Sequence, residues 1–590
     1  MHISRLIIAV AVALGLPSGL QGQSACPAGE ISYVFVDNHS IFDVDDLPVN
    51  RFRWAFELAN ALHIRTRPSF IRRELQFRVG DCYEPFLIAD SERILRRLPF
   101  ISNAEVFGIR QDDGSWHVVV DTRDEWSTQF GVTMEFENGA DLRSVSLTEQ
   151  NFLGRGFQVS AFLIQDDANE RLGGRFFTPQ LFGTQANFQI AGGNTQVGDF
   201  WSIGVTQPFI GETGRWAGTF SASLNEDYFD YSAGTPSAPA NVLLPEEQRR
   251  FELTGMVRFG EPGNLTSVGL GLARAESDAS DFPESLRFVE NRDFANPQPA
   301  PQEAVDEVSR QTFFSSGTRI NLLFGQRNIR FVQRTGLDAL QGVSDLQVGS
   351  DVAVTLGRTV ATGGAPDDFN TRVRLYAAAA PSPFTIVSQF AVEGRQIFFD
   401  PSTERRGWRD VIGEFDLLVY WQPDRLDRHT FFARVAGAGG WTMDRPFQLT
   451  LGGRRGLRGF NEEAFPGARR IVMNLEDRIY LGWPAPTFAD FGITLFADVG
   501  RTFPGDVPFG FDSGWKGSIG GGLRIGFPAG SRGVARIDLA WPLGASRGTG
   551  GPVLRISLAD LLGLRQGLAD PQLTRSRLLR IGPDRFNPRR

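Results

Sequence analysis

Lysine, cysteine and histidine are scarce in this chain of 590 residues, and each scarcity excludes a class of function. Lys516 is the only lysine, so arginine carries nearly all of the positive charge. Two cysteines and five scattered histidines leave little material for a zinc site or a histidine-based catalytic cluster. The formal net charge of −8 disfavours a basic nucleic-acid-binding protein. We therefore expect no metal, no cofactor, no nucleic-acid partner and no enzymatic activity.

Long apolar runs are missing after the first residues of the chain. Arg5 precedes an apolar stretch over residues 6–16, and small and polar residues follow as far as Ser24. A charged start, a short apolar core and a small-residue exit are typical of a secretory signal peptide, which we predict over residues 1–24. The apolar stretch is shorter than the roughly 20 residues that a helix needs to cross a bilayer.

Cleavage of this signal would leave Cys26 close to the mature N-terminus, with two possible roles. A lipid anchor on Cys26 would favour an aliphatic side chain three residues earlier, where the chain has Gln23. A disulfide between Cys26 and Cys82 is the other possibility, because an oxidising compartment permits it. The sequence leaves both open, since it does not give the distance between the two cysteines.

Strand-like and helix-like patterns are mixed over residues 31–125. Residues 31–36 read as a strand, and residues 51–62 read as a helix. Apolar residues then recur at helical spacing up to Leu98, and two strands joined by a turn with Asp113-Gly114 close the unit. The pattern predicts a small α+β domain.

From Trp126 the spacing of apolar residues changes to two and remains so to about Leu558. Over residues 126–137, for example, Trp126, Phe130 and Phe136 fall on one face, and mostly polar residues fall on the other. Short turns alternate with long polar loops, the longest over residues 227–248 and 276–310. A mainly β fold is expected, with a transmembrane antiparallel β-barrel over residues 126–558. We predict sixteen strands, on the assumption that some runs between 171 and 357 form loop hairpins.

The chain continues past the last expected strand as an arginine-rich tail over residues 559–590. Binding of the tail to anionic lipid or cell wall is one interpretation. A disordered, solvated tail on the periplasmic side is favoured by its composition.

Four motifs occur in order along the chain. A glycine-rich stretch ends in Arg458-Gly459-Phe460, and Phe496 and Gly500 flank Asp498 two strands later. An earlier turn contains Asn151, Gly154 and Gly156. The fourth motif comprises Ile71–Leu75, Gly80-Asp81, Arg93–Leu98 and Val118–Asp121. Together they resemble the BamA/TamA superfamily of outer-membrane assembly and translocation proteins, with residues 31–125 similar to its POTRA module.

The resemblance implies a location, a set of partners and a mechanism. The protein would lie in the outer membrane of a Gram-negative-type bacterium, with the POTRA-like domain in the periplasm. It would insert or translocate unfolded or β-rich client proteins, with periplasmic chaperones or accessory proteins as further partners. The first and last barrel strands would form a lateral gate, and the Arg-Gly-Phe loop would fold into the barrel.

The spacing permits the inward loop that the resemblance implies. Alternation along the two strands after the loop places Glu476 and Asp498 on the lumen face, where Arg458 could bind both carboxylates. Asn474 and Arg478 share the face of Glu476. The same alternation points Asp477 toward lipid. The alternative functions are a passive outer-membrane channel or a surface receptor on the same scaffold, in which these charges merely line a wet pore.

Overall fold

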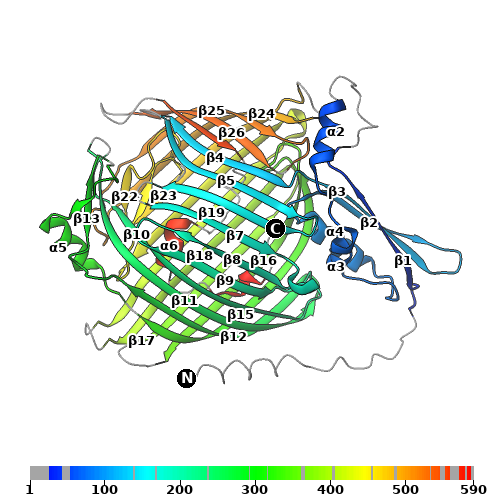
Figure 1. Cartoon of the computed structure of the whole chain (residues 1–590), viewed down its shortest axis with the longest axis horizontal. Helices are drawn as coiled ribbons and strands as arrows, with labels where there is room; N and C mark the ends of the chain where they lie inside the picture. Colours follow the sequence, from blue (N-terminus) through cyan, green and yellow to red (C-terminus); the bar gives the residue numbers. More distant parts are fainter. Residues whose placement is uncertain are drawn as a thin grey trace.

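The computed structural model describes most of the chain and has two parts, a barrel and a small N-terminal region (Figure 1). The described residues are 26–42, 53–136, 140–166, 169–235, 238–291, 293–314, 316–360, 366–400, 405–453, 456–483, 488–531, 533–544, 552–558, 570–577 and 581–586. The predicted signal peptide lies outside them.

The barrel is a closed antiparallel sheet of twenty strands, and the prediction of sixteen is wrong. β27 pairs with β4 and so closes the cylinder. The strands in chain order are β4 (Thr128–Phe136), β5 (Ala140–Phe152), β6 (Phe157–Asp166), β7 (Asn169–Thr178), β8 (Asn187–Asn194), β9 (Asp199–Gln207), β10 (Trp216–Ser232), β11 (Ala240–Glu261), β12 (Asn264–Asp278), β15 (Gly317–Thr335), β16 (Val343–Val360), β17 (Asp367–Ala379), β18 (Phe384–Phe399), β19 (Gly407–Trp421), β20 (His429–Trp441), β23 (Arg469–Tyr480), β24 (Asp490–Phe503), β25 (Lys516–Gly526), β26 (Val534–Leu543) and β27 (Val553–Leu558).

The strand count was underestimated because the strands differ greatly in length. β8 has only 8 residues, whereas β11 has 22 and extends beyond the rest of the wall. The runs between 171 and 357 that the sequence suggested as loop hairpins are themselves barrel strands, from β7 to β16. An even division of the chain into strands of similar length therefore does not apply here.

The two faces of the barrel wall have opposite chemistry, as alternation along β24 illustrates. Leu495 is 54% exposed on the outer face, whereas Thr494 and Asp498 are fully buried on the inner face. The same inversion recurs around the cylinder, where large apolar side chains point outward and charged ones are buried inward. A soluble protein would show the reverse, because apolar burial stabilises its core.

Three strands and three helices form the N-terminal region. They are β1 (Ile31–His39), α2 (Arg53–Leu62), α3 (Pro68–Glu74), α4 (Pro85–Arg96), β2 (Ile101–Arg110) and β3 (Trp116–Asp124). β3 lies between β1, which it pairs in parallel, and β2, which it pairs antiparallel. A buried cluster that includes Phe70, Ile71 and Leu95 joins α3 and α4 to this sheet.

The assignment of a POTRA-like module to this region is not upheld. The finding is a small three-stranded sheet with helices and no clear POTRA domain. Short apolar repeats at strand and helix spacing fit many small α+β arrangements, so the sequence pattern did not specify one. Cys26 and Cys82 are joined by a disulfide in this region, with their Cα atoms 5.2 Å apart.

The N-terminal region is held against one end of the barrel by polar contacts. Arg96 on α4 donates to both carboxylate oxygens of Asp345 on β16, at 3.1 and 3.0 Å. The buried Asp90 carboxylate accepts a hydrogen bond from the backbone N–H of Glu212 at 3.0 Å. Glu74 at the end of α3 accepts one from the side chain of Gln180, in the turn between β7 and β8.

We expect this last contact to depend on pH. Burial raises the pKa of Glu74 to about 7, although the hydrogen bond from Gln180 lowers it. A carboxyl with a raised folded-state pKa stabilises the fold fully below its unfolded value near 4.5, and this contribution is lost as the pH rises to about 7. Thermal unfolding of the wild type should therefore show a loss of up to about 3 kcal/mol between pH 4.5 and 7 that Glu74→Gln lacks.

The matched control for this prediction is Glu57→Gln, which changes a carboxyl on α2 whose side chain is 56% exposed. It should leave the pH profile of the wild type unchanged. Superimposable profiles for the wild type and Glu74→Gln would contradict the prediction.

A lobe of loop structure lies at the opposite end of the barrel from the N-terminal region (Figure 1). It contains β13 (Arg287–Glu290), β14 (Gln298–Pro299) and α5 (Gln302–Gln311), together with the extended ends of β10 and β11. A cluster of buried apolar residues, including Tyr231, Leu244 and Val308, gives this lobe its own core.

The described part of the C-terminal tail lies inside the barrel, contrary to the prediction of a solvated periplasmic tail. It includes α6 (Pro571–Ser576) and a short 3₁₀ turn, η5 (Pro583–Arg585), both within the barrel outline in Figure 1. Arg577 contacts Glu414 and Glu393 on the lumen face, and Phe586 is 1% exposed. Among the described residues of the tail, Arg577 and Arg585 are paired with carboxylates of the inner wall.

No helix within the described ranges is long and apolar enough to cross a membrane.

Candidate functional site inside the barrel

The loop between β20 and β23 folds into the lumen. Within it, β21 (Leu449–Leu451) and β22 (Phe465–Gly467) pair as a separate two-stranded sheet. Leu457 and Phe460 are buried there against Phe465. This apolar cluster seats the loop, so that the intervening residues meet the inner wall.

Gly459 lies directly against the inner wall. A Cβ atom placed on Gly459 would lie 2.7 Å from Cβ of Ser518 on β25 and 2.9 Å from the backbone N of Pro542 on β26. Contacts under 3.0 Å are essentially never seen for real Cβ atoms. Only glycine fits at this position without displacing the loop or the wall.

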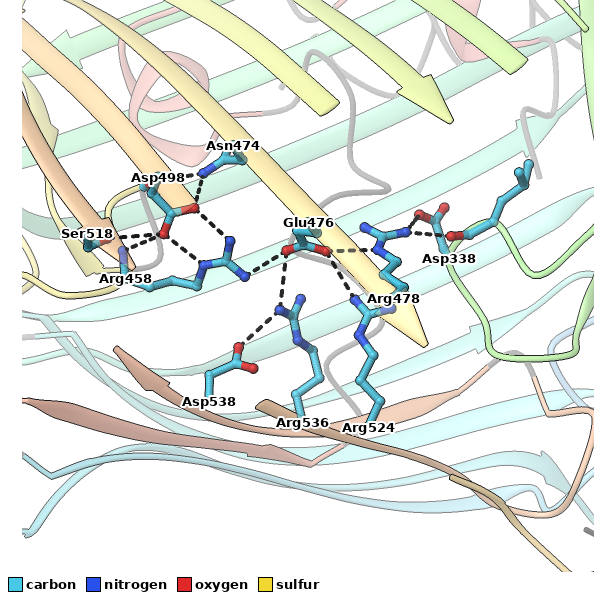
Figure 2. Close-up of polar contacts among 12 residues, drawn as sticks. Asp338, Arg458, Asn474, Glu476, Arg478, Asp498, Ser518, Arg524, Arg536 and Asp538 are labelled. Atoms are coloured by element: carbon cyan, nitrogen blue, oxygen red, sulfur yellow. Dashed lines mark hydrogen bonds and ion pairs between the residues drawn. The ribbon is translucent and has the colours of Figure 1, made fainter. Parts of the chain in front are cut away.

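The Arg458 guanidinium lies between two buried carboxylates (Figure 2). Its Nε and Nη2 donate to the two oxygens of Asp498 on β24, at 2.9 and 2.6 Å. Its Nη1 donates to Glu476 on β23 at 2.6 Å. The Arg458 side chain is 11% exposed, Glu476 1% and Asp498 0%. This three-residue cluster, here called the Arg458 latch, joins the loop to two adjacent strands.

Neutral partners complete the environment of Asp498. The backbone N–H of Arg458 donates to Asp498 at 3.2 Å, and the Asn474 amide donates to it at 2.8 Å. The Ser518 hydroxyl donates at 3.3 Å. Asn474 also donates to the loop carbonyl of Gly456 at 2.9 Å, so β23 binds the loop backbone directly.

Three further arginines surround Glu476. Arg478 donates to it at 2.8 Å, and Arg524 and Arg536 lie 3.7 Å from its oxygens. Arg478 reaches on to Asp338, and Arg536 binds Asp538 at 3.0 Å (Figure 2). The latch is therefore the centre of a charge network that spans β23 to β26.

The charge on Arg458 is stabilised by this arrangement. Burial alone would lower its pKa, but the hydrogen bond to Asp498 and the charge of Glu476 outweigh burial and raise the pKa above its ordinary value. The Arg458 guanidinium also stacks 3.6 Å from the ring centroid of Phe496, a cation–π contact. Arg458 is cationic at any working pH, so the latch does not open by losing that proton.

The structure brings together only some of the residues that the motifs singled out. Arg458, Glu476 and Asp498 meet, with Phe496 beneath them, while Gly459 contacts the wall beside Ser518. Phe460 packs against Phe465, with ring centroids 5.4 Å apart, and Gly500 lies beside Leu451 of the loop. These residues form one site, which fastens the loop to the inner wall.

Asn151, Gly154 and Gly156 belong to a different place. They form the turn between β5 and β6, where Asn151 accepts from the N–H of Gly156 at 2.8 Å and donates to Thr66 at 2.8 Å. Gly154 accepts a backbone hydrogen bond from Arg67 at 2.9 Å. This turn docks the N-terminal region. The Cys26–Cys82 disulfide is also part of the N-terminal region and does not contribute to the latch.

The structure places Asn474 and Arg478 on the inner face beside Glu476, as the alternation along their strand predicts. Sequence reasoning missed their hydrogen bonds to the two carboxylates, and it missed Ser518, Arg524 and Arg536. Asn474 and Asp498 are also direct register partners. Asp477 faces outward as predicted by parity, but it pairs with His429 at 3.0 Å and is 24% exposed.

Within the described residues, the seam between the first and last strands and the adjacent β26–β27 pairing are the shortest strand pairings of the barrel wall. In the described residues β27 and β4 pair over five positions, from Leu554 with Phe136 to Leu558 with Val132, whereas β15 and β16 pair over eighteen. On the lumen side Arg555 donates to Glu135 across the seam at 2.7 Å. Among the residues that the structure describes, a short run of backbone pairing and the buried Arg555–Glu135 ion pair hold the cylinder closed there.

The latch and the seam hold parts of the chain in place. Within the part of the chain that the structure describes, no group of three His, Cys, Asp or Glu residues could hold a metal ion. The arrangement can fasten a loop, fill a lumen and close a seam.

Comparisons with known proteins gave matches among solved structures only: no family model and no curated protein matches the chain. BamA from Haemophilus ducreyi lacking POTRA domains 1–3 is 13% identical, with 89% of this chain and 84% of that one covered and a TM-score of 0.36. CdiB from Acinetobacter baumannii is 11% identical over 90% of this chain and 74% of that one, with a TM-score of 0.42. CdiB from Escherichia coli is 11% identical over 94% and 96%, with a TM-score of 0.33.

Proposed function

We propose that this chain is an outer-membrane barrel protein that inserts or translocates β-rich client proteins. The seam between β4 and β27 acts as a lateral gate, and the Arg458 latch holds the inward loop that supports the barrel wall beside it. No nucleotide or cofactor takes part, because the free energy comes from client folding into the bilayer.

The Arg458 latch is the observation that carries the proposal. A simple pore has no need of a buried arginine that binds two strands through four hydrogen bonds, three from the side chain and one from the backbone. Burial of charges is costly unless their partners are all in place, so such a cluster is a specific device. It lies on β23 and β24, and its charge network extends through β25 to β26, next to β27 at the seam.

The outer face of the barrel supports a place in the membrane. Exposed side chains there include Leu270, Ile320, Leu475 and Trp541, each at least 44% exposed. The lumen face carries buried charges such as Arg319 and Asp368. An apolar exterior around a polar interior suits a barrel surrounded by lipid.

The gate is tested by locking the seam. Thr133 and Ser557 are register partners across it and both are buried, so Thr133→Cys with Ser557→Cys should form a disulfide. Purified protein in liposomes should accelerate folding of an added unfolded barrel protein, and oxidation of the cysteine pair should abolish that acceleration, because client strands add to an exposed strand edge.

The matched control places the same crosslink where no opening is proposed. Asn328 and Ser350 are register partners in the long β15–β16 pairing, so Asn328→Cys with Ser350→Cys should leave the acceleration intact. Liposomes that show steady ion conductance and no acceleration would point to a passive channel. Full acceleration by the seam-locked protein would contradict the gate.

A further inference from the structure

The inner wall of the barrel carries a segment of the chain that belongs to none of its strands, and Asp570 at its start pairs with Arg470 on β23. Residues 570–577 and 581–586 lie along this wall, and only one backbone–backbone hydrogen bond joins them to the rest of the described chain, from the N–H of Phe209 to the carbonyl of Phe586. Side chains make the other contacts. Release of the segment would therefore break no strand pairing.

We infer that this wall is a peptide-binding site and that the C-terminal segment is its resident ligand. The ligand class is a peptide with an arginine, an acidic residue seven positions later and an aromatic residue two positions after that. In this chain the three are Arg577, Asp584 and Phe586. The inference stands apart from client insertion, because a barrel that inserts nothing could carry such a site.

The basic anchor is Arg577. Its Nη2 donates to Glu414 on β19, and its Nε lies 3.3 Å from Glu393 on β18. Arg250 on β11 donates to the Arg577 carbonyl at 3.2 Å. The side chains of Arg577, Glu393 and Glu414 are each no more than 10% exposed. The wall therefore presents a pair of carboxylates that can bind one guanidinium.

The acidic anchor is Asp584, which binds arginines of the wall. Asp584 accepts from Arg374 on β17 at 2.5 Å, and Arg372 on the same strand adds a second positive charge nearby. The next residue, Arg585, donates to Glu252 on β11 at 2.8 Å. Two anchors of opposite sign, seven residues apart, fix the direction of the segment on the wall.

Apolar contacts lie between and beyond the charged anchors. Ile581 and Phe586 are each 1% exposed, in a cluster with Phe209, Met256 and Leu323. These residues form an apolar patch on a lumen face that also carries many buried charges. Phe586 packs against Phe209 with ring centroids 6.3 Å apart. Without the segment, this apolar patch would face the lumen, so it is matched to a ligand.

The bound segment also touches the loop that carries the latch. Gln572 on α6 accepts from the N–H of Thr450 at 3.1 Å and donates to its hydroxyl at 2.8 Å. Thr450 lies in β21, just before the glycine-rich stretch of the latch loop. A segment bound at the peptide site therefore contacts the loop that carries Arg458 directly.

The test uses full-length protein in detergent micelles and a fluorescent synthetic peptide with the sequence of residues 570–590. In the wild type the resident segment competes at a millimolar effective concentration, so the peptide should bind weakly. Reversal of both anchors in the chain, by Arg577→Glu with Asp584→Arg, should release the segment. The peptide should then bind on the order of a hundredfold more tightly, as fluorescence anisotropy would show.

Ile581→Cys reports release directly, because the only other cysteines in the chain form a disulfide. The thiol should be protected from a maleimide in the otherwise wild-type chain and labelled at least tenfold faster in the anchor-reversed chain. Adding Glu414→Arg and Arg374→Asp to the anchor-reversed chain should reseat the segment and abolish peptide binding. Arg310→Glu with Glu307→Arg, an exposed pair on α5, is the control for the charge changes.

Each outcome decides the inference. Tight binding only to the anchor-reversed chain, lost with a peptide that carries the same two reversals, supports it. A released thiol without peptide binding shows that the wall is no peptide site. A thiol that stays protected after reversal shows that the two anchors do not hold the segment. Either of these results overturns the inference, whatever the protein does to client barrels.

Discussion

Arg458→Ala is expected to detach the inward loop and to stop client insertion. Removal of the guanidinium leaves Glu476 and Asp498 buried, with Asp498 losing both of its charged hydrogen bonds. Breaking a buried ion pair from one side costs about 3–5 kcal/mol, because the remaining charge is uncompensated. Loss of that amount should raise the detached population of the loop by a factor on the order of a thousand.

Two measurements check this expectation. Limited proteolysis should cut the loop of the variant rapidly while the barrel strands remain intact, and the liposome assay should show little acceleration of client folding. Arg458→Lys keeps the charge but not the planar fork, so it should recover only part of both signals.

The matched control for the latch is Arg501→Ala. Arg501 binds Asp512 at the barrel surface, where the two side chains are 30% and 43% exposed, so solvent screens the pair and its loss should have little effect on stability. If Arg458→Ala and Arg501→Ala behave alike in proteolysis and insertion, the latch has no role in either.

Gly459→Val is the second substitution with a large expected effect. The added side chain would collide with Ser518 and with the backbone of Pro542, and backbone cannot move aside without distorting β26. Overpacking of this kind typically costs about 1–3 kcal/mol. The loop should leave its seat even though Arg458 and both carboxylates are unchanged, and the thermal unfolding midpoint of the barrel should fall.

Gly255→Ala is the control for glycine replacement, because a Cβ atom on Gly255 in β11 would meet nothing within 4 Å. It should leave the unfolding midpoint and loop proteolysis unchanged. A Gly459→Val protein whose loop resists protease would contradict the prediction, because the loop would then stay bound to the inner wall despite the added side chain.

Alternation along single strands predicted much of the latch. The local sequence alone predicts that Asp498 and Glu476 face the lumen, because successive side chains of a strand point to opposite sides. That information needs no knowledge of neighbouring strands. The inward faces of Asn474 and Arg478 follow from the same rule.

Features that depend on distant strands were beyond local patterns. The number of strands depends on how long each strand is, and strands as unequal as β8 and β11 occur in the same barrel. Alternation along a strand does not give its length. The place of the tail depends on charges of β17, β18 and β19 that meet Arg577 and Asp584 only in the folded barrel. A run of arginines looks solvated in sequence when its partners lie far away along the chain.

Closure at the seam has a consequence for the order of assembly. The seam joins residues more than four hundred positions apart, as with Leu554 and Phe136, so its formation carries the largest chain-closure cost of any pairing in the sheet. Pairings between neighbouring strands in the sequence form sooner, and the wall exists first as a curved, open sheet. The latch loop and the C-terminal segment can reach their seats sideways during that interval, before the last strand meets the first. The cylinder thus closes around contents already in place, and its filling needs no passage through either mouth.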